Sequence, residues 1–231
     1  MTSGPAPDHH LLKRLHDIAS AERTVQHLRR YFGLDPGPGE VPYTGSRFEH
    51  LAGGGDRPET ANCFTADDLI AVERLSVRVP QELILELLEG SLGSHLSNLL
   101  SEVPTDLDLA DADVSLLQQG SSAHAAYDAL RARHGLGRTR VAKLLARKRP
   151  RLLPVYDSVV GCAAGYPDSW WCALHSVLRA DNQALHRAYA GLRSDAGLPE
   201  TVSVLRVIDV AVWMRHHDDH DSKRPTKCVW R

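Results

Sequence analysis

The sequence predicts an all-α protein built as a two-lobed bundle of helices. Apolar residues recur every three or four positions through most of the 231-residue chain, which is the spacing of amphipathic helices. Ser, Thr, Asp and Pro stand before these stretches and glycines stand after them, as at the ends of helices. The alternation over Val202–Val204 is typical of a strand, but the apolar run is too long for one and no partner strand is apparent, so we assign it to a helix.

The first half of the chain alternates loops with short helices. Gly33 ends the first helix, and a loop-rich stretch over 33–63 follows. Thr65 and Asp68 have the spacing of a capping box, and Pro80 stands in the first turn of the next helix. The ranges expected to be helical are 10–32, 66–75, 80–89 and 94–102.

The second half continues in the same way around a proline-rich segment. Ser121 or Ser122 caps one helix, and Asp157 or Ser158 caps another. Pro150 and Pro154 predict an extended segment over 148–156. The ranges expected to be helical are about 122–133, 138–147, a helix after 157, a helix from 170, 181–195 and 202–214.

Composition sets limits on function. With 42% hydrophobic residues and a formal net charge of −2, the chain is an ordinary globular protein, and any nucleic-acid binding must come from a local patch. There is no signal peptide and no apolar stretch of 18 residues, so we expect a cytoplasmic protein without membrane contact.

Cysteine and histidine usage predicts no metal and no cofactor. The four cysteines lack C-x-x-C spacing, so we expect reduced thiols rather than a disulfide framework, a zinc site or an iron–sulfur cluster. The histidines between His216 and His220 have metal-ligand chemistry, but they stand at the end of the last helix, where we expect a solvated terminus.

Positive charge is concentrated in one segment. Nine of the 27 Lys and Arg residues lie in the 24 residues from Arg131 to Pro154, which contain no Asp or Glu. Gly135 and Gly137 form a turn between two expected helices, and such a turn exposes backbone N–H groups that suit a phosphate. The alternative is an ordinary helix end at Gly135 followed by a tight turn.

The segment from the turn to Asp157 resembles the helix–hairpin–helix and Gly/Pro-Asp motif of the DNA glycosylase superfamily. The resemblance rests on Gly135-Leu136-Gly137, on Ala142 near the family's small helix residue, and on Pro154-Val155-Tyr156-Asp157. Twenty residues separate Gly137 from Asp157, as the family motif requires, and about 26 residues are covered in all. The core Lys148–Asp157 is also similar to a group of bacterial proteins of unassigned function.

This resemblance implies a single glycosylase-like unit over 1–231 with a cleft between its lobes. Lobe one would take in about 60–150, including the helix–hairpin–helix at 121–147. Lobe two would combine about 10–32 with 157–215, and flexible tails would lie at 1–8 and 216–231.

The implied activity is that of a monofunctional N-glycosidase, a DNA glycosylase-like hydrolase with Asp157 as the catalytic carboxylate. A carboxylate beneath the sugar stabilises the oxocarbenium-like transition state or orients water. Thr139 stands where lyase members carry a nucleophilic Lys, so no lyase step is expected. The expected DNA-binding residues are Gly135, Gly137, Arg138, Thr139, Arg140, Lys143 and Lys148. The possible base pocket comprises Tyr43, Glu49 and Tyr156.

Three alternatives stay open at this point. Asp157 can be only the N-cap of the next helix, a contribution of about 1 kcal/mol. The chain can be a non-catalytic helix–hairpin–helix DNA-binding protein. The same scaffold can act on a small nucleoside or another metabolite, and the sequence leaves the oligomeric state open.

Overall fold

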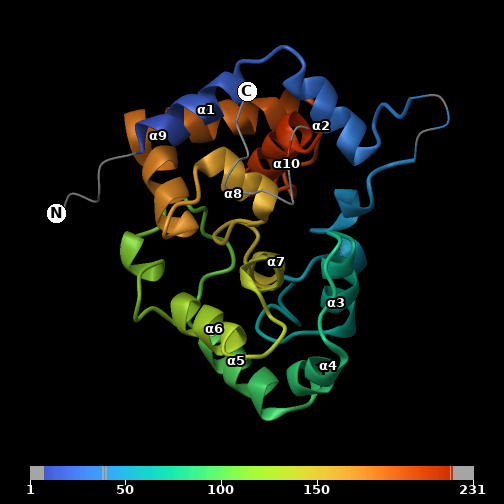
Figure 1. The fold of residues 1–231 in the computed structure, drawn as a ribbon, viewed down its shortest axis with the longest axis vertical. Helices are drawn as coiled ribbons and strands as arrows, with labels where there is room; N and C mark the ends of the chain where they lie inside the picture. Colours follow the sequence, from blue (N-terminus) through green and yellow to red (C-terminus); the bar gives the residue numbers. More distant parts are fainter. Residues whose placement is uncertain (1–7, 38, 40, 219, 221–231) are drawn as a thin grey trace. The chain divides into compact units, whose positions relative to one another are not determined.

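The computed structural model describes residues 8–37, 39, 41–218 and 220. Within these residues the chain forms helices, turns and loops and contains no strand (Figure 1). The prediction of an all-α fold is therefore confirmed. Two compact units are present: unit 1 takes in Met1–Tyr43, Leu109–Asp111 and Tyr156–Arg231, and unit 2 takes in Thr44–Asp108 and Ala112–Val155.

Unit 1 is organised around α10, which contacts all four of the unit's other helices (Figure 1, red). Its side chains from Val204 to Val212 are buried, and a helix that is buried all round belongs at the centre of a bundle. The helices of unit 1 are α1 (His9–Ala19), α2 (Thr24–Phe32), α8 (Ser158–Ala164), α9 (Trp170–Asp195) and α10 (Val204–His216).

Two helical stretches of unit 1 are broken. One break separates α1 from α2, and the other lies inside α9. The helix expected over 10–32 is interrupted after α1, where the Thr24 hydroxyl donates to the Ile18 carbonyl at 2.6 Å and holds a turn. Inside α9, residues Asp181–Gln183 have φ values from 48° to 64°. This left-handed break lies where the sequence predicts one helix to end and the 181–195 helix to begin.

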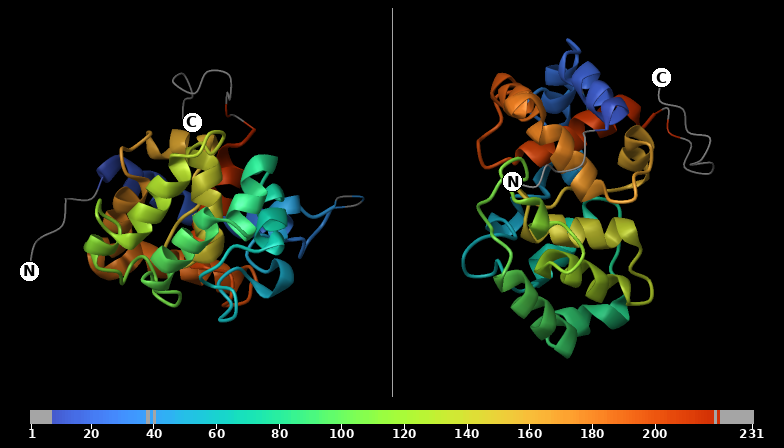
Figure 2. Two further views of the ribbon diagram at one scale, coloured as in Figure 1. Left: turned by 90° about the horizontal axis from the view of Figure 1, so that it is seen from below. Right: turned by 90° about the vertical axis from the view of Figure 1, so that its left-hand side faces the viewer.

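Unit 2 is organised around α7, which packs against α3 and α6, while α5 packs against α4 and α6 (Figures 1 and 2). The expected capping box is present, because the Thr65 N–H donates to Asp68 Oδ2 at 2.9 Å. The helices are α3 (Ala66–Glu73), α4 (Gln81–Leu88), α5 (Ser91–Ser101), α6 (Ser122–Arg131) and α7 (Arg138–Lys148). Short 3-10 turns are η1 (Thr44–Arg47), η2 (Leu51–Gly53) and η3 (Val114–Leu116).

Both expected tails fall largely outside the described residues. Asp8 is described, and its carboxylate caps α1 by accepting from the N–H groups of His10 and Leu11. At the other end, residues 216–218 and 220 are described. None of the described helices has the length and hydropathy needed to cross a membrane.

Candidate functional site

The turn between α6 and α7 requires glycine at one position and leaves space at the other. Gly135 has φ +81°, and a Cβ there would lie 2.7 Å from Pro80 Cγ, so a larger residue is strained. Leu136 between the glycines is buried. Gly137 caps α7 with φ −71° and no side-chain bond, and a Cβ there would meet nothing within 4 Å. A side chain at Gly137, the N-cap of α7, would therefore enter open space.

Arginines hold the backbone of this turn. Arg131 Nη1 donates to the Leu136 carbonyl at 2.6 Å, and Arg140 Nη1 donates to the Gly135 carbonyl at 2.8 Å. Thr139 and Arg140 are half-buried, whereas Arg131, Arg133 and Arg138 are exposed. Positive charge that solvent can reach thus surrounds the turn.

Four further cations of the segment, Lys143 and those at 147–149, are buried, whereas Arg151 is exposed and pairs with Asp108. This burial corrects the assignment of two predicted DNA-binding residues. Lys143 Nζ donates to the Leu75 carbonyl at 2.9 Å, and Lys148 Nζ donates to Asp68 Oδ2 at 2.8 Å. Lys148 is 0% exposed and Lys143 is buried. A phosphate cannot reach either ammonium group, because α7 is the central helix of unit 2.

Arg147 organises the loop that precedes α3. Its guanidinium forms an ion pair with Asp68 at 3.0 Å and donates to the carbonyls of Phe48, Glu49 and Leu51 at 2.6, 2.8 and 2.6 Å. Glu49, expected in a base pocket, therefore belongs to this network of unit 2 through its backbone.

Arg149 does the same for two other loop segments. It donates to the carbonyls of Val103 and Ala61 at 2.8 and 2.7 Å, to Asn62 Oδ1 at 2.6 Å, and to the Leu100 carbonyl. Burial lowers the pKa of Arg149 to about 10, and burial also lowers the pKa of Lys148. The buried cations of this segment thus bond to groups in the interior of unit 2.

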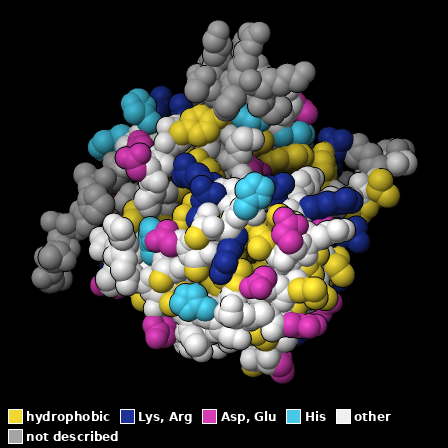
Figure 3. All heavy atoms as spheres, turned by 60° about the horizontal axis from the view of Figure 1, so that its bottom comes forward, with side chains coloured by type: hydrophobic (Ala, Val, Ile, Leu, Met, Phe, Trp, Pro, Cys, Tyr) yellow, Lys and Arg dark blue, Asp and Glu magenta, His cyan; other side chains and the backbone are white. Residues whose placement is uncertain are grey.

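One face of the molecule shows how the surface charge is distributed. In Figure 3, Lys and Arg side chains lie between Asp and Glu side chains with apolar groups among them. Mixed charge of this kind is ordinary for a protein surface. An anion site must therefore be argued from local geometry, as at the α6–α7 turn.

In unit 1, Asp157 is the N-cap of α8. Its Oδ1 accepts from the N–H groups of Val159 and Val160, both at 3.0 Å, and the residue is half-buried. The capping interpretation is therefore confirmed, and a catalytic role stays a prediction. Residues Val159–Ala164 of α8 are buried and include no cation.

Aromatic and charged groups lie near Asp157 in the same unit. The negative charge of Asp157 contributes to a raised pKa of Tyr31, although burial is the larger cause. The Tyr31 hydroxyl accepts from Arg206 Nη2 at 2.7 Å, and Arg206 forms a buried ion pair with Asp209. Tyr43 stacks on Tyr31 with 5.1 Å between ring centroids and 9° between planes. We call Tyr31, Tyr43, Arg206, Asp209 and Trp213 the Tyr31 cluster.

Comparison with known proteins gives a family. A family model described as "Family of unknown function (DUF6308)" matches residues 24–216. The chain belongs to this family. The predicted similarity to proteins of unassigned function is thereby confirmed, whereas the resemblance to DNA glycosylases stays a prediction. No curated protein matches the chain, and no solved structure matches it.

The matched range of this DUF6308 protein takes in both halves of the predicted site. Unit 2 holds the α6–α7 turn with Arg138, Thr139 and Arg140, and unit 1 holds Asp157. Tyr156 and Tyr43 also lie in unit 1. Tyr156 is buried, with its ring 6.1 Å from that of Trp170 and its hydroxyl 2.7 Å from where a Cβ on Gly161 would lie.

Sequence reasoning missed the polar members of the Tyr31 cluster. A signal was present, because Arg206 and Asp209 are charged residues one turn apart in the otherwise apolar first half of α10. Charges inside an apolar helix are buried only when they are paired. That spacing identifies the pair but not Tyr31, which comes from α2.

Proposed function

We propose that this DUF6308 protein binds nucleic acid through contacts between the α6–α7 turn and the phosphate backbone. The observation that carries this proposal is the free space at the Cβ position of Gly137, where α7 begins without a side-chain cap. We define the hairpin surface as Arg133 together with residues 135–140.

A phosphate is the ligand that this geometry favours. The first N–H groups of a helix lack intrahelical partners, and the helix dipole places partial positive charge at that end. Gly137 has no side chain to hold an anion away from those groups. Arg133 and Arg138 are exposed beside them and add Coulomb attraction. Phosphate contacts of this kind position a protein on nucleic acid without reading its sequence.

Salt dependence tests the proposal directly. Fluorescence anisotropy with a labelled duplex and the matching single strand would be measured across salt concentration for the wild type and for Arg133→Ala/Arg138→Ala. We expect the slope of log K against log salt to become shallower by about 0.7 to 0.9 per lost phosphate contact. The control is Arg23→Ala, since Arg23 is exposed and lies in unit 1.

Either of two results would contradict the proposal. A flat plot for the wild type would exclude phosphate contacts. An equal loss of affinity in the Arg23 control would show that only general charge matters.

A second candidate function is hydrolysis of an N-glycosidic bond with Asp157 as the essential carboxylate. It is favoured by the half-buried Asp157 carboxylate, whose negative charge contributes to the raised pKa of Tyr31. In that reaction the base leaves C1′ with the bonding electron pair. The oxygen of a water molecule bonds to C1′, and the water's proton passes to the departed base. Asp157 would stabilise the positive charge that develops on the sugar.

Asp157→Asn separates catalysis from capping. Asn caps helices about as well as Asp, so the variant keeps α8 but lacks the negative charge. We expect base release from a panel of damaged duplexes to be lost while circular dichroism and thermal unfolding stay unchanged. Release that survives the exchange would exclude the catalytic role. Release from free nucleosides but not from duplexes would favour a metabolite as substrate.

A further inference from the structure

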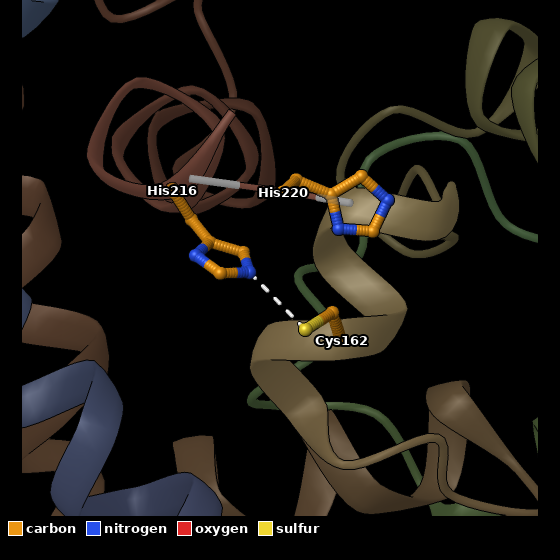
Figure 4. A group of neighbouring side chains, drawn as sticks. All are labelled: Cys162, His216 and His220. Carbon is orange, nitrogen blue, oxygen red and sulfur yellow. Dashed lines mark hydrogen bonds between the residues drawn. The ribbon is translucent and has the colours of Figure 1, made fainter. Parts of the chain in front are cut away.

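A histidine at the end of α10 and a second one four residues further on lie close to a cysteine of α8 in unit 1 (Figure 4). The candidate ligand atoms of Cys162, His216 and His220 all lie within 4.8 Å of one another. His216 Nε2 lies 3.1 Å from Cys162 Sγ, and the rings of His216 and His220 lie 5.7 Å apart between centroids. We propose that these three side chains bind a zinc ion.

The fold brings the three residues together from positions far apart in the sequence. Helix α8 packs against α10, and His216 is the last residue of α10. The turn that follows, in which the His220 N–H donates to the His217 carbonyl at 3.4 Å, returns His220 to the side of His216. Cys162 and His216 are 4% and 3% exposed, and His220 is half-buried. The expectation of a solvated terminus is therefore wrong for His216.

The ligand types and distances favour zinc over other common cations. Thiolate and imidazole suit zinc, whereas magnesium and calcium prefer oxygen ligands. In a tetrahedral zinc site, bonds of about 2.1 Å to nitrogen and 2.3 Å to sulfur place these two atoms about 3.5 Å apart. The observed 3.1 Å between His216 and Cys162 needs only a small adjustment. Two histidines with three residues between them also match the spacing in structural zinc sites.

A disulfide is the competing state of Cys162, which the structure gives as disulfide-bonded. A disulfide sulfur is not a thiolate, so a bridge and a metal exclude each other. One observation favours the metal. A disulfide needs no imidazole, yet the candidate nitrogens of two imidazoles lie within 4.8 Å of the Cys162 sulfur.

Zinc at this position would tie the end of α10 to α8, the helix that Asp157 caps. It is independent of nucleic-acid binding.

Metal analysis of the full chain, purified under reducing conditions, tests the site. We expect about one zinc per chain. Loss of a direct ligand in Cys162→Ser or His220→Gln should weaken zinc binding by more than the roughly 10–100-fold typical of outer-shell changes. The matched controls, Cys172→Ser and His217→Gln, should bind zinc as the wild type does.

Two further readouts guard against misfolded variants. Cobalt in place of zinc should give thiolate-to-cobalt charge-transfer absorption that Cys162→Ser abolishes. A chelator should lower the melting temperature of the wild type but not that of His220→Gln, whose exchange lies beyond the end of α10. Absence of metal from the reduced wild type, or equal loss in the controls, would overturn the proposal. So would mass spectrometry showing Cys162 fully oxidised and metal-free.

Discussion

The two units solve the same packing problem with different chemistry. In unit 1 the central helix α10 is apolar through most of its buried length and contains the buried ion pair between Arg206 and Asp209. In unit 2 the central helix α7 ends in a buried cationic run, and Arg147 and Arg149 donate to loop carbonyls. Unit 2 contains the loop-rich segment 44–63, whose backbone groups need partners when buried. Cationic side chains can therefore serve as an interior scaffold where regular helix is scarce.

The largest effect is expected from removing a scaffold arginine. Arg149→Met leaves the carbonyls of Val103, Ala61 and Leu100 without their donor. We expect the free energy of unfolding to fall by about 3–5 kcal/mol, because several buried acceptors lose partners together. Urea unfolding measures this loss. The exposed Arg138→Ala should stay within about 0.5 kcal/mol of the wild type, and similar losses for both would remove the scaffold interpretation.

Substitutions of Asp68 and Lys148 test how the positive charge buried in unit 2 is neutralised. Asp68→Asn removes the carboxylate that faces both Arg147 and Lys148, so we expect a loss of about 3–5 kcal/mol. Lys148→Met should cost less, because the Arg147–Asp68 pair remains. A larger loss for Lys148→Met than for Asp68→Asn would contradict this order.

The lowered pKa of Lys148 also predicts a pH dependence of stability. Burial makes the folded-state pKa lower than the unfolded value of 10.5. Between those two values the unfolded chain binds more protons, so stability rises with pH. Across that window the free energy of unfolding of the wild type should increase relative to Lys148→Met. Parallel curves for the two proteins would show that Lys148 does not titrate differently on folding.

The ion pair of unit 1 should behave differently from the scaffold of unit 2. Arg206→Leu leaves the Asp209 charge buried and the Tyr31 hydroxyl without this donor, which should cost about 3–5 kcal/mol. Arg206→Leu/Asp209→Leu removes both charges from an apolar helix and should recover most of that loss. A double-mutant cycle in urea measures the coupling. Additive losses would mean that the pair is not coupled.

The smallest effects are expected at the two glycines of the hairpin surface. Gly135→Ala forces a side chain into a left-handed conformation against Pro80, at a cost of about 1–3 kcal/mol. Gly137→Ala meets open space and should cost about 1 kcal/mol or less as a poorer helix cap. If phosphate binds at α7, Gly137→Ala should nevertheless weaken nucleic-acid binding in anisotropy measurements. Undiminished affinity would place the phosphate elsewhere.

Local signals in the sequence predicted several helix ends correctly. The capping box at Thr65, the glycine turn at 135–137 and the cap at Asp157 were all visible, because each depends on residues close together in the chain. The break between α1 and α2 was not visible, since the apolar spacing continues through it. Such breaks are determined by the tertiary packing of the helices on either side.

The parts of the candidate sites that depend on residues close together in the chain were predicted, and those that depend on long-range packing were not. The sequence by itself determined the all-α class, the α6–α7 turn and the capping of α8, because these follow from periodicity and short-range hydrogen bonds. Only the tertiary structure decided which cations face inward, since charge density does not say which side of α7 is buried. Likewise only packing brings Cys162 to His216 and His220, because metal ligands are chosen by distance in space and not by spacing along the chain.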